Sequence, residues 1–290
     1  MWRFVPFLRS VVLRVTWATG EYRADNYLPF HGPEPCKGSN CGNNVPPVHM
    51  VYINLRDRVS RKNALSQHVK TTMWHGPHTL QRLEARTGTL ERAYAEWQHP
   101  VPENVPWAEE VREYWSRPVT LGEVGCSLSH LAALDMLRER EDGIKVVLED
   151  DAAWDTSRFA DTLHDWVGLL DKYDPLWDVL LLGVAFLTPP QNATHDLVRV
   201  GYFYQAHAYA VSSRGLEKIR VDDSTPLVAW DEVLPAMGQA HPQARLNALY
   251  ALASPLRIYA PRKKLAEQLA AVAFERKCSY EKVSKRRVLK

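Results

Sequence analysis

Short apolar runs alternate with longer amphipathic segments through the middle of the chain. Apolar, largely aliphatic runs predict buried strands over 49–55, 145–149 and 178–183, and alternation predicts another over 204–211. Helical periodicity predicts helices over 58–70, 120–142, 156–170 and 213–220. Strands that alternate with helices indicate an α/β fold, in which a mixed, mostly parallel sheet carries helices on both faces.

The outer parts of the chain lack this pattern. Residues 1–47 predict an irregular leader, and residues 72–118 a long irregular excursion with one helix near 89–97. Residues 269–290 predict a basic helical tail. Arginines interrupt the apolar N-terminus, so we expect neither a signal peptide nor a membrane span. A cytoplasmic location follows, with the ER or Golgi lumen as the alternative if a targeting signal lies upstream.

Composition narrows the class of protein. The 290 residues are 46% hydrophobic and carry a formal net charge of +2, which suits one large domain and gives no basic stripe for nucleic acid. Of four cysteines, Cys126 and Cys278 are expected to be thiols. Cys36 and Cys41 share a loop rich in Gly, Asn and Pro, where they form either a small disulfide or two thiols.

Three consecutive carboxylates follow the apolar run that ends at Leu148. Glu149, Asp150 and Asp151 crowd negative charge at the end of a predicted strand, where ligands of α/β sheets gather. A divalent cation relieves such crowding, and hard oxygen ligands suit Mg²⁺ or Mn²⁺. The alternative is an acidic turn that only begins the next helix.

The helix that begins after Thr120 has two unlike faces. Thr120 and Glu123 have the spacing of a capping box. Val124, Leu128 and Leu131 form a bulky side, whereas the opposite side carries the small residues Gly122, Gly125, Cys126 and Ser129. His130 borders the small side, either as a functional residue or as a satisfied structural histidine.

Polar residues also mark three other segments. In the predicted strand 204–211, alternation places Gln205 and His207 on one face with Tyr209 and Val211, which either lines a cleft or is exposed. Asp231 and Glu232 follow Trp230, where a carboxylate serves as a base or Asp231 only as a helix N-cap. After the first strand come Asn54 and the phosphate-binding candidates Arg58 and Arg61.

Five motifs in order resemble glycosyltransferase family 25. They are VYINLRDRVSR, LGEVGCSLSH, VVLEDD, HAYAVSSRG and WDEVLP, and the likeness covers roughly residues 48–262. The resemblance implies a GT-A-like (Rossmann-type) domain over 48–268, a UDP-sugar donor and inversion at the anomeric carbon.

Carried over by position, the resemblance implies three groups of site residues. Glu149 and Asp151 would bind Mn²⁺ or Mg²⁺, and Asp231 would be the catalytic base with Glu232 beside it. The residues on the donor side would be Asn54, Arg61, Glu123, Ser129, His130 and Asp150, and the residue patterns described above add Arg58 and His207.

The sequence therefore predicts a metal-dependent inverting hexosyltransferase. It would move galactose or glucose from a UDP-hexose to a hydroxyl of a glycan or of a hydroxylysine-like side chain on a protein. The alternative is a non-catalytic binding or adhesion protein that retains the GT-A fold.

Overall fold

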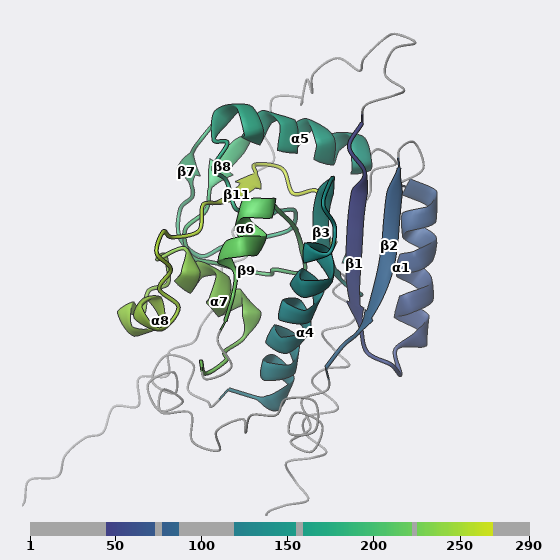
Figure 1. Cartoon of the computed structure of the whole chain (residues 1–290), viewed down its shortest axis with the longest axis horizontal. Helices are drawn as coiled ribbons and strands as arrows, with labels where there is room; N and C mark the ends of the chain where they lie inside the picture. Colours follow the sequence, from purple (N-terminus) through teal and green to yellow (C-terminus); the bar gives the residue numbers. More distant parts are fainter. Residues whose placement is uncertain (1–44, 73–76, 87–118, 155–158, 222–224, 269–290) are drawn as a thin grey trace, which may run out of the picture. The chain divides into compact units, whose positions relative to one another are not determined.

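The computed structural model describes residues 45–72, 77–86, 119–154, 159–221 and 225–268, which all lie in one compact unit (Figure 1). Most of the predicted leader, the predicted helix near 89–97 and the predicted basic tail lie outside these residues. No helix in the described ranges has the length and apolar character needed to cross a membrane.

A mixed eight-stranded sheet forms the centre of the domain, in the order β2-β1-β3-β10-β5-β11-β8-β7. Strands β2, β1 and β3 are parallel, as are β5 and β11, whereas β10 and β8 run antiparallel to both of their neighbours. The α/β prediction is confirmed. The strands are β1 (Val48–Asn54), β2 (His78–Glu84), β3 (Ile144–Glu149), β5 (Val179–Leu181), β7 (Gln191–Asn192), β8 (Leu197–Arg199), β10 (Ala208–Val211) and β11 (Ile258–Pro261).

Two small ribbons accompany this sheet. Strand β4 (Ala152–Ala153) pairs with β12 (Glu267–Gln268), directly after the acidic motif. Strand β6 (Ala185–Phe186) pairs with β9 (Phe203–Tyr204). Both ribbons extend from the edge of the sheet where β3 and β5 end.

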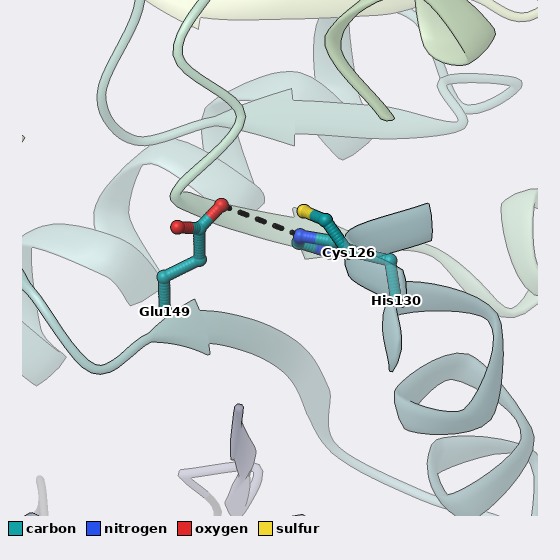
Figure 2. A group of neighbouring side chains, drawn as sticks. All are labelled: Cys126, His130 and Glu149. Carbon is teal, nitrogen blue, oxygen red and sulfur yellow. Dashed lines mark hydrogen bonds and ion pairs between the residues drawn. The ribbon is translucent and has the colours of Figure 1, made fainter. Parts of the chain in front are cut away.

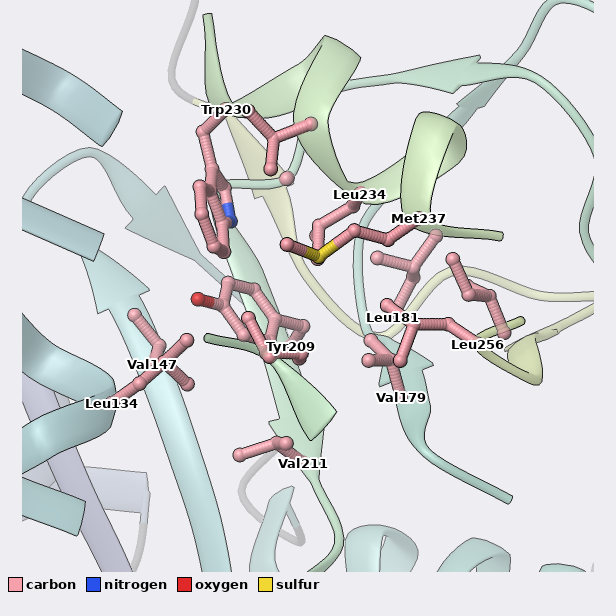
Figure 3. Close-up of a cluster of buried hydrophobic side chains, with 14 of the residues drawn as sticks. Leu134, Val147, Val179, Leu181, Tyr209, Val211, Trp230, Leu234, Met237 and Leu256 are labelled. Atoms are coloured by element: carbon pink, nitrogen blue, oxygen red, sulfur yellow. The ribbon is translucent and has the colours of Figure 1, made fainter. Parts of the chain in front are cut away.

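Helices cover both faces of the sheet, as the alternation of buried side chains requires. Val147, Tyr209 and Val211 belong to the core beneath α4, α6, α7 and α8, part of which is shown in Figure 3. Val146 and Leu148 point the other way, into the core beneath α1 and α5. The helices are α1 (Val59–Thr72), α4 (Leu121–Arg138), α5 (Phe159–Tyr173), α6 (Ser213–Lys218), α7 (Trp230–Met237) and α8 (Ala244–Leu249).

Three predictions of secondary structure are wrong. Strand β2 lies in the segment predicted to be irregular, because its mostly polar and exposed residues carry little apolar signal at the edge of the sheet. The helix predicted over 120–142 ends at Arg138, since the next four residues are all charged and offer the sheet no apolar side chain. The strand predicted over 204–211 is broken at Gln205, whose φ of 71° is incompatible with a strand.

Gly183 lies where three segments meet just beyond β5. A Cβ atom at this position would lie 2.4 Å from both the carbonyl oxygen of Ala266 and Nε2 of His207. The Ala266 backbone is fixed there, because its N–H donates to the carbonyl of Leu182. Gly183 therefore allows the ring of His207 to pack directly against the strand end.

We expect Gly183→Ala to lower the free energy of unfolding by about 1–3 kcal/mol, because a backbone carbonyl or a buried ring must move. Denaturant unfolding measures this change. The matched control is Gly168→Ala in α5, where an added Cβ meets no atom within 4 Å. That variant should be stabilised by about 0.5–1 kcal/mol, since alanine is the better helix former. Equal effects of the two substitutions would contradict the close packing at Gly183.

Candidate active site

The acidic motif lies at the carboxyl ends of two parallel strands. Glu149 is the last residue of β3 and lies opposite Ile53 of β1, so Asn54 and the three carboxylates share one edge of the sheet. Parallel strands bring their loops together at this edge, where ligands of α/β proteins bind. The prediction that the triplet follows a buried strand is confirmed.

Arg61 of α1 neutralises part of this negative charge. Its Nη1 donates to Oδ1 of Asp150 at 2.9 Å and lies 3.8 Å from Oδ2 of Asp151. Asp150 also accepts from Nδ2 of Asn54 at 2.8 Å, and Asp151, which is buried, accepts from Nε2 of Gln268 at 3.3 Å. The two aspartates are thus fixed by neighbours from α1, β1 and β12.

Asn54 links the first strand to the turn that follows it. Its Nδ2 donates to the carbonyl of Arg58 at 3.1 Å, and its Oδ1 accepts from Nε of Arg82 at 3.0 Å. Arg58 closes the turn by donating its N–H to the carbonyl of Leu55, and its side chain is half-buried. Sequence reasoning missed Arg82, because it lies on β2.

Glu149 lies against α4. Its Oε1 lies 3.4 Å from Nε2 of His130, and Cys126 lies one helical turn before the histidine (Figure 2). One ligand atom from each of these three residues lies within 4.8 Å of the others. The small side of this helix thus borders the site, and Cys126 is a site residue that the sequence reasoning did not select.

Aromatic residues fix the ring of His130. The ring stacks on Trp230 with 5.2 Å between centroids and 3° between planes, and Nδ1 lies 3.1 Å from the hydroxyl of Tyr209. His130 and both aromatic residues are buried. The histidine therefore has defined partners on both ring nitrogens.

Glu123 and Ser129 hold the backbone around the site. Glu123 accepts from the N–H and hydroxyl of Thr120 at 2.8 and 2.9 Å, which confirms the predicted capping box. The buried hydroxyl of Ser129 donates to the carbonyl of Gly125 at 2.6 Å and accepts from the N–H of Arg86 at 2.8 Å. These contacts anchor α4 and the end of β2.

Asp231, from the first turn of α7, reaches the break in the predicted strand. Its two carboxylate oxygens accept the N–H groups of Gln205 and Ala206, each at 3.0 Å. The N-cap of α7 is Ala229, so the alternative that Asp231 only caps the helix is wrong.

The environment raises the pKa of Asp231. Burial is the largest cause and the charge of Glu149 adds to it, whereas the two backbone N–H groups and His130 act in the opposite direction. A carboxylate with a raised pKa is a stronger proton acceptor than an exposed aspartate.

Glu232 points away from Asp231, as adjacent helical residues do. Its Oε2 accepts from the hydroxyl of Tyr202 at 2.9 Å and lies 2.6 Å from Nε2 of His241. Because Nδ1 of His241 accepts the N–H of Gln243, Nε2 carries the proton and donates to Glu232. Glu232 thus belongs to a buried network whose other members the sequence reasoning missed.

His207 contacts the end of β3 through its backbone. Its carbonyl accepts the N–H of Glu149 at 2.7 Å, and its buried ring packs against Gly183. The alternative that this strand face is exposed is wrong, because Tyr209 and Val211 on it are buried.

Known proteins resemble nearly half of the chain. Procollagen galactosyltransferase 2 of Mus musculus is 32% identical over 143 residues, which are 47% of this chain and 23% of the relative. Procollagen galactosyltransferase 1-A of Xenopus laevis is 34% identical over 140 residues, 44% of this chain and 22% of the relative. The inactive glycosyltransferase 25 family member 3 of Homo sapiens is 32% identical over 142 residues, with coverages of 47% and 23%.

The aligned region is less than a quarter of each of these relatives. The family model described as glycosyltransferase family 25 (LPS biosynthesis protein) matches residues 48–188. That match includes β1, α4 and the acidic motif and ends before Asp231. Residues 48–188, with the acidic motif at the end of β3, are thus similar to glycosyltransferase family 25.

Proposed function

We propose that this chain transfers a hexose from a UDP-sugar to an acceptor hydroxyl with inversion. One observation carries the proposal: the segment 205–207 contacts both carboxylate groups, because its N–H groups donate to Asp231 of α7 and its His207 carbonyl accepts the N–H of Glu149 at the end of β3. Relatives named procollagen galactosyltransferase favour galactose over glucose and a protein-bound acceptor such as a hydroxylysine-like side chain, with a glycan hydroxyl as the other acceptor.

The donor side would lie along β1 and α4. Arg58 and Arg61 border the turn after β1, where guanidinium groups suit the diphosphate. Asn54 and Asp150 orient Arg61, and His207 and His130 border the acidic motif. Glu123 and Ser129 act as positioning residues, because their polar groups hold backbone.

The carboxylates fit a hard divalent ion. Glu149 and Asp151 would hold Mn²⁺ or Mg²⁺, which binds through one or two carboxylates together with substrate phosphates. When bound, such an ion neutralises charge that develops on the leaving diphosphate. Asp150 already accepts from Asn54 and Arg61, so it orients the motif.

Asp231 would be the base. The acceptor oxygen forms its bond to the anomeric carbon while the bond to UDP breaks, and the hydroxyl proton passes to a carboxylate oxygen of Asp231. The backbone N–H groups of Gln205 and Ala206 fix this carboxylate in place. Its raised pKa favours proton acceptance.

A non-catalytic binding protein is the second candidate. It is favoured by relatives that are named inactive and match the chain at an identity similar to that of the galactosyltransferases. Sequence similarity alone therefore does not separate the two functions, and the carboxylates have to be tested directly.

The first test concerns donor and metal. Transfer from UDP-galactose or UDP-glucose should require Mn²⁺ or Mg²⁺, stop with a chelator and fall sharply in Asp151→Asn, which removes a charged ligand. UDP with Mn²⁺ should raise the melting temperature of the unmodified chain, because ligands of the native state stabilise it. The control Asp135→Asn alters an exposed aspartate of α4 and should leave both readouts unchanged. Transfer that persists with chelator would refute metal dependence.

The second test concerns the base. Asp231→Asn should lower turnover by about 10²-fold or more, the range of general-base loss, and should leave UDP affinity nearly unchanged. Turnover and calorimetric UDP titration measure the two effects. Glu232→Gln is the matched neighbour and should affect stability more than chemistry, because Glu232 belongs to the Tyr202–His241 network.

The pH profile gives a second measure of the same assignment. Catalysis needs ionised Asp231, so kcat/KM should fall as pH drops through its raised pKa, above the range of an exposed aspartate. Normal transfer by Asp231→Asn with loss in Glu232→Gln would reverse the assignment. Activity in both variants would place the base elsewhere.

A further inference from the structure

A thiol, an imidazole and a carboxylate converge at the edge of the proposed donor site. Cys126 and His130 lie four residues apart on α4, so both side chains leave the helix on one face. Glu149 meets them from the end of β3 (Figure 2). Ligand atoms of the three residues lie within 4.8 Å of one another.

The spacing fits the ligand shell of a small divalent ion. Two ligands at about 2.0 Å from a tetrahedral ion lie about 3.3 Å apart. Nε2 of His130 and Oε1 of Glu149 are 3.4 Å apart, so an ion could bind both without movement of the backbone. The sulfur of Cys126, which is present as a thiol, needs a shift of about 1.4 Å at most to complete the set, given zinc–sulfur bonds of about 2.3 Å.

Neighbouring side chains orient the ring of His130, as neighbouring groups do for metal-binding histidines in general. Nδ1 of His130 lies 3.1 Å from the hydroxyl of Tyr209, and the ring stacks on Trp230. A hydrogen bond from Nδ1 to this hydroxyl leaves the lone pair of Nε2 directed toward Glu149. The ring is buried and held on both sides before any ion binds.

We propose that Cys126, His130 and Glu149 bind a borderline divalent transition metal, such as Zn²⁺ or Co²⁺. Sulfur and imidazole donors select these ions over Mg²⁺, which prefers oxygen. Binding converts the thiol to a thiolate and releases its proton to solvent, and the ion keeps its charge. Three protein ligands leave a fourth position for water or a ligand oxygen.

This site differs in donor chemistry from the oxygen site proposed for Mn²⁺ or Mg²⁺, and the two share Glu149. The inference rests on the proposed function only in placing the ion beside the donor phosphates. Metal binding can be measured without any donor, so the two proposals fail separately.

Co²⁺ titration of the purified 290-residue chain tests the site, because a cobalt–thiolate bond gives a charge-transfer absorption in the near ultraviolet. We expect this band to saturate at one Co²⁺ per chain and to be displaced by Zn²⁺. Cys126→Ser should abolish it and weaken Co²⁺ binding by about 100-fold or more, beyond the loss typical of an outer-shell change. Glu149→Gln and His130→Asn should weaken binding while the thiolate band remains at high Co²⁺.

The chain offers a matched thiol control. The triple variant Cys36→Ser, Cys41→Ser, Cys278→Ser replaces the other three cysteines and should keep the band. Loss of the band in this variant, or its survival in Cys126→Ser, would overturn the proposal, as would the absence of any band. Asp231→Asn should keep the Co²⁺ band while it loses transfer, which distinguishes failure of this site from failure of the proposed function.

Discussion

The three-residue segment 205–207 connects the parts of the candidate site. Its first two N–H groups bind the carboxylate of Asp231, and the carbonyl of His207 accepts the N–H of Glu149. The positive φ of Gln205 turns the chain at the start of this segment. One backbone segment therefore sets the positions of the carboxylates of β3 and α7 relative to each other, and Gly183 provides the room for it.

Elements with a uniform pattern were predictable from the sequence. Strands β1, β3 and β5 are buried on both faces, so their apolar runs stand out, and the capping box marks the start of α4. Strand β2 could not be found in this way, because an edge strand needs few apolar residues. The break at Gln205 carries no sequence signal either, since a left-handed residue is usually Gly or Asn.

In the candidate site, too, only the residues whose position follows from a local pattern were predictable from the sequence. The acidic motif was predictable because its position depends only on the strand before it. Its neighbours come from distant parts of the chain: Gln268 of β12 donates to Asp151, and Cys126 on the small side of α4 lies near Glu149. Arg82 of β2 reaches the site through Asn54. The network of Glu232 with Tyr202 and His241 also depends on tertiary packing. Local pattern cannot indicate which distant side chains meet.

The distribution of charge bears on whether the site is catalytic. Arg61 offsets the charge of Asp150 and Asp151, whereas the carboxylate of Asp231 accepts from two neutral backbone N–H groups. Burial and the like charge of Glu149 both oppose ionisation of Asp231, as its raised pKa records. A protein that only binds a ligand could carry a neutral side chain with one hydrogen-bond acceptor at position 231. That side chain would remove the repulsion and would lose only one of the two backbone hydrogen bonds. A buried carboxylate with a raised pKa suits proton transfer, and groups that oppose stability concentrate where chemistry needs them. The electrostatics of Asp231 thus favour the transferase over the binding protein.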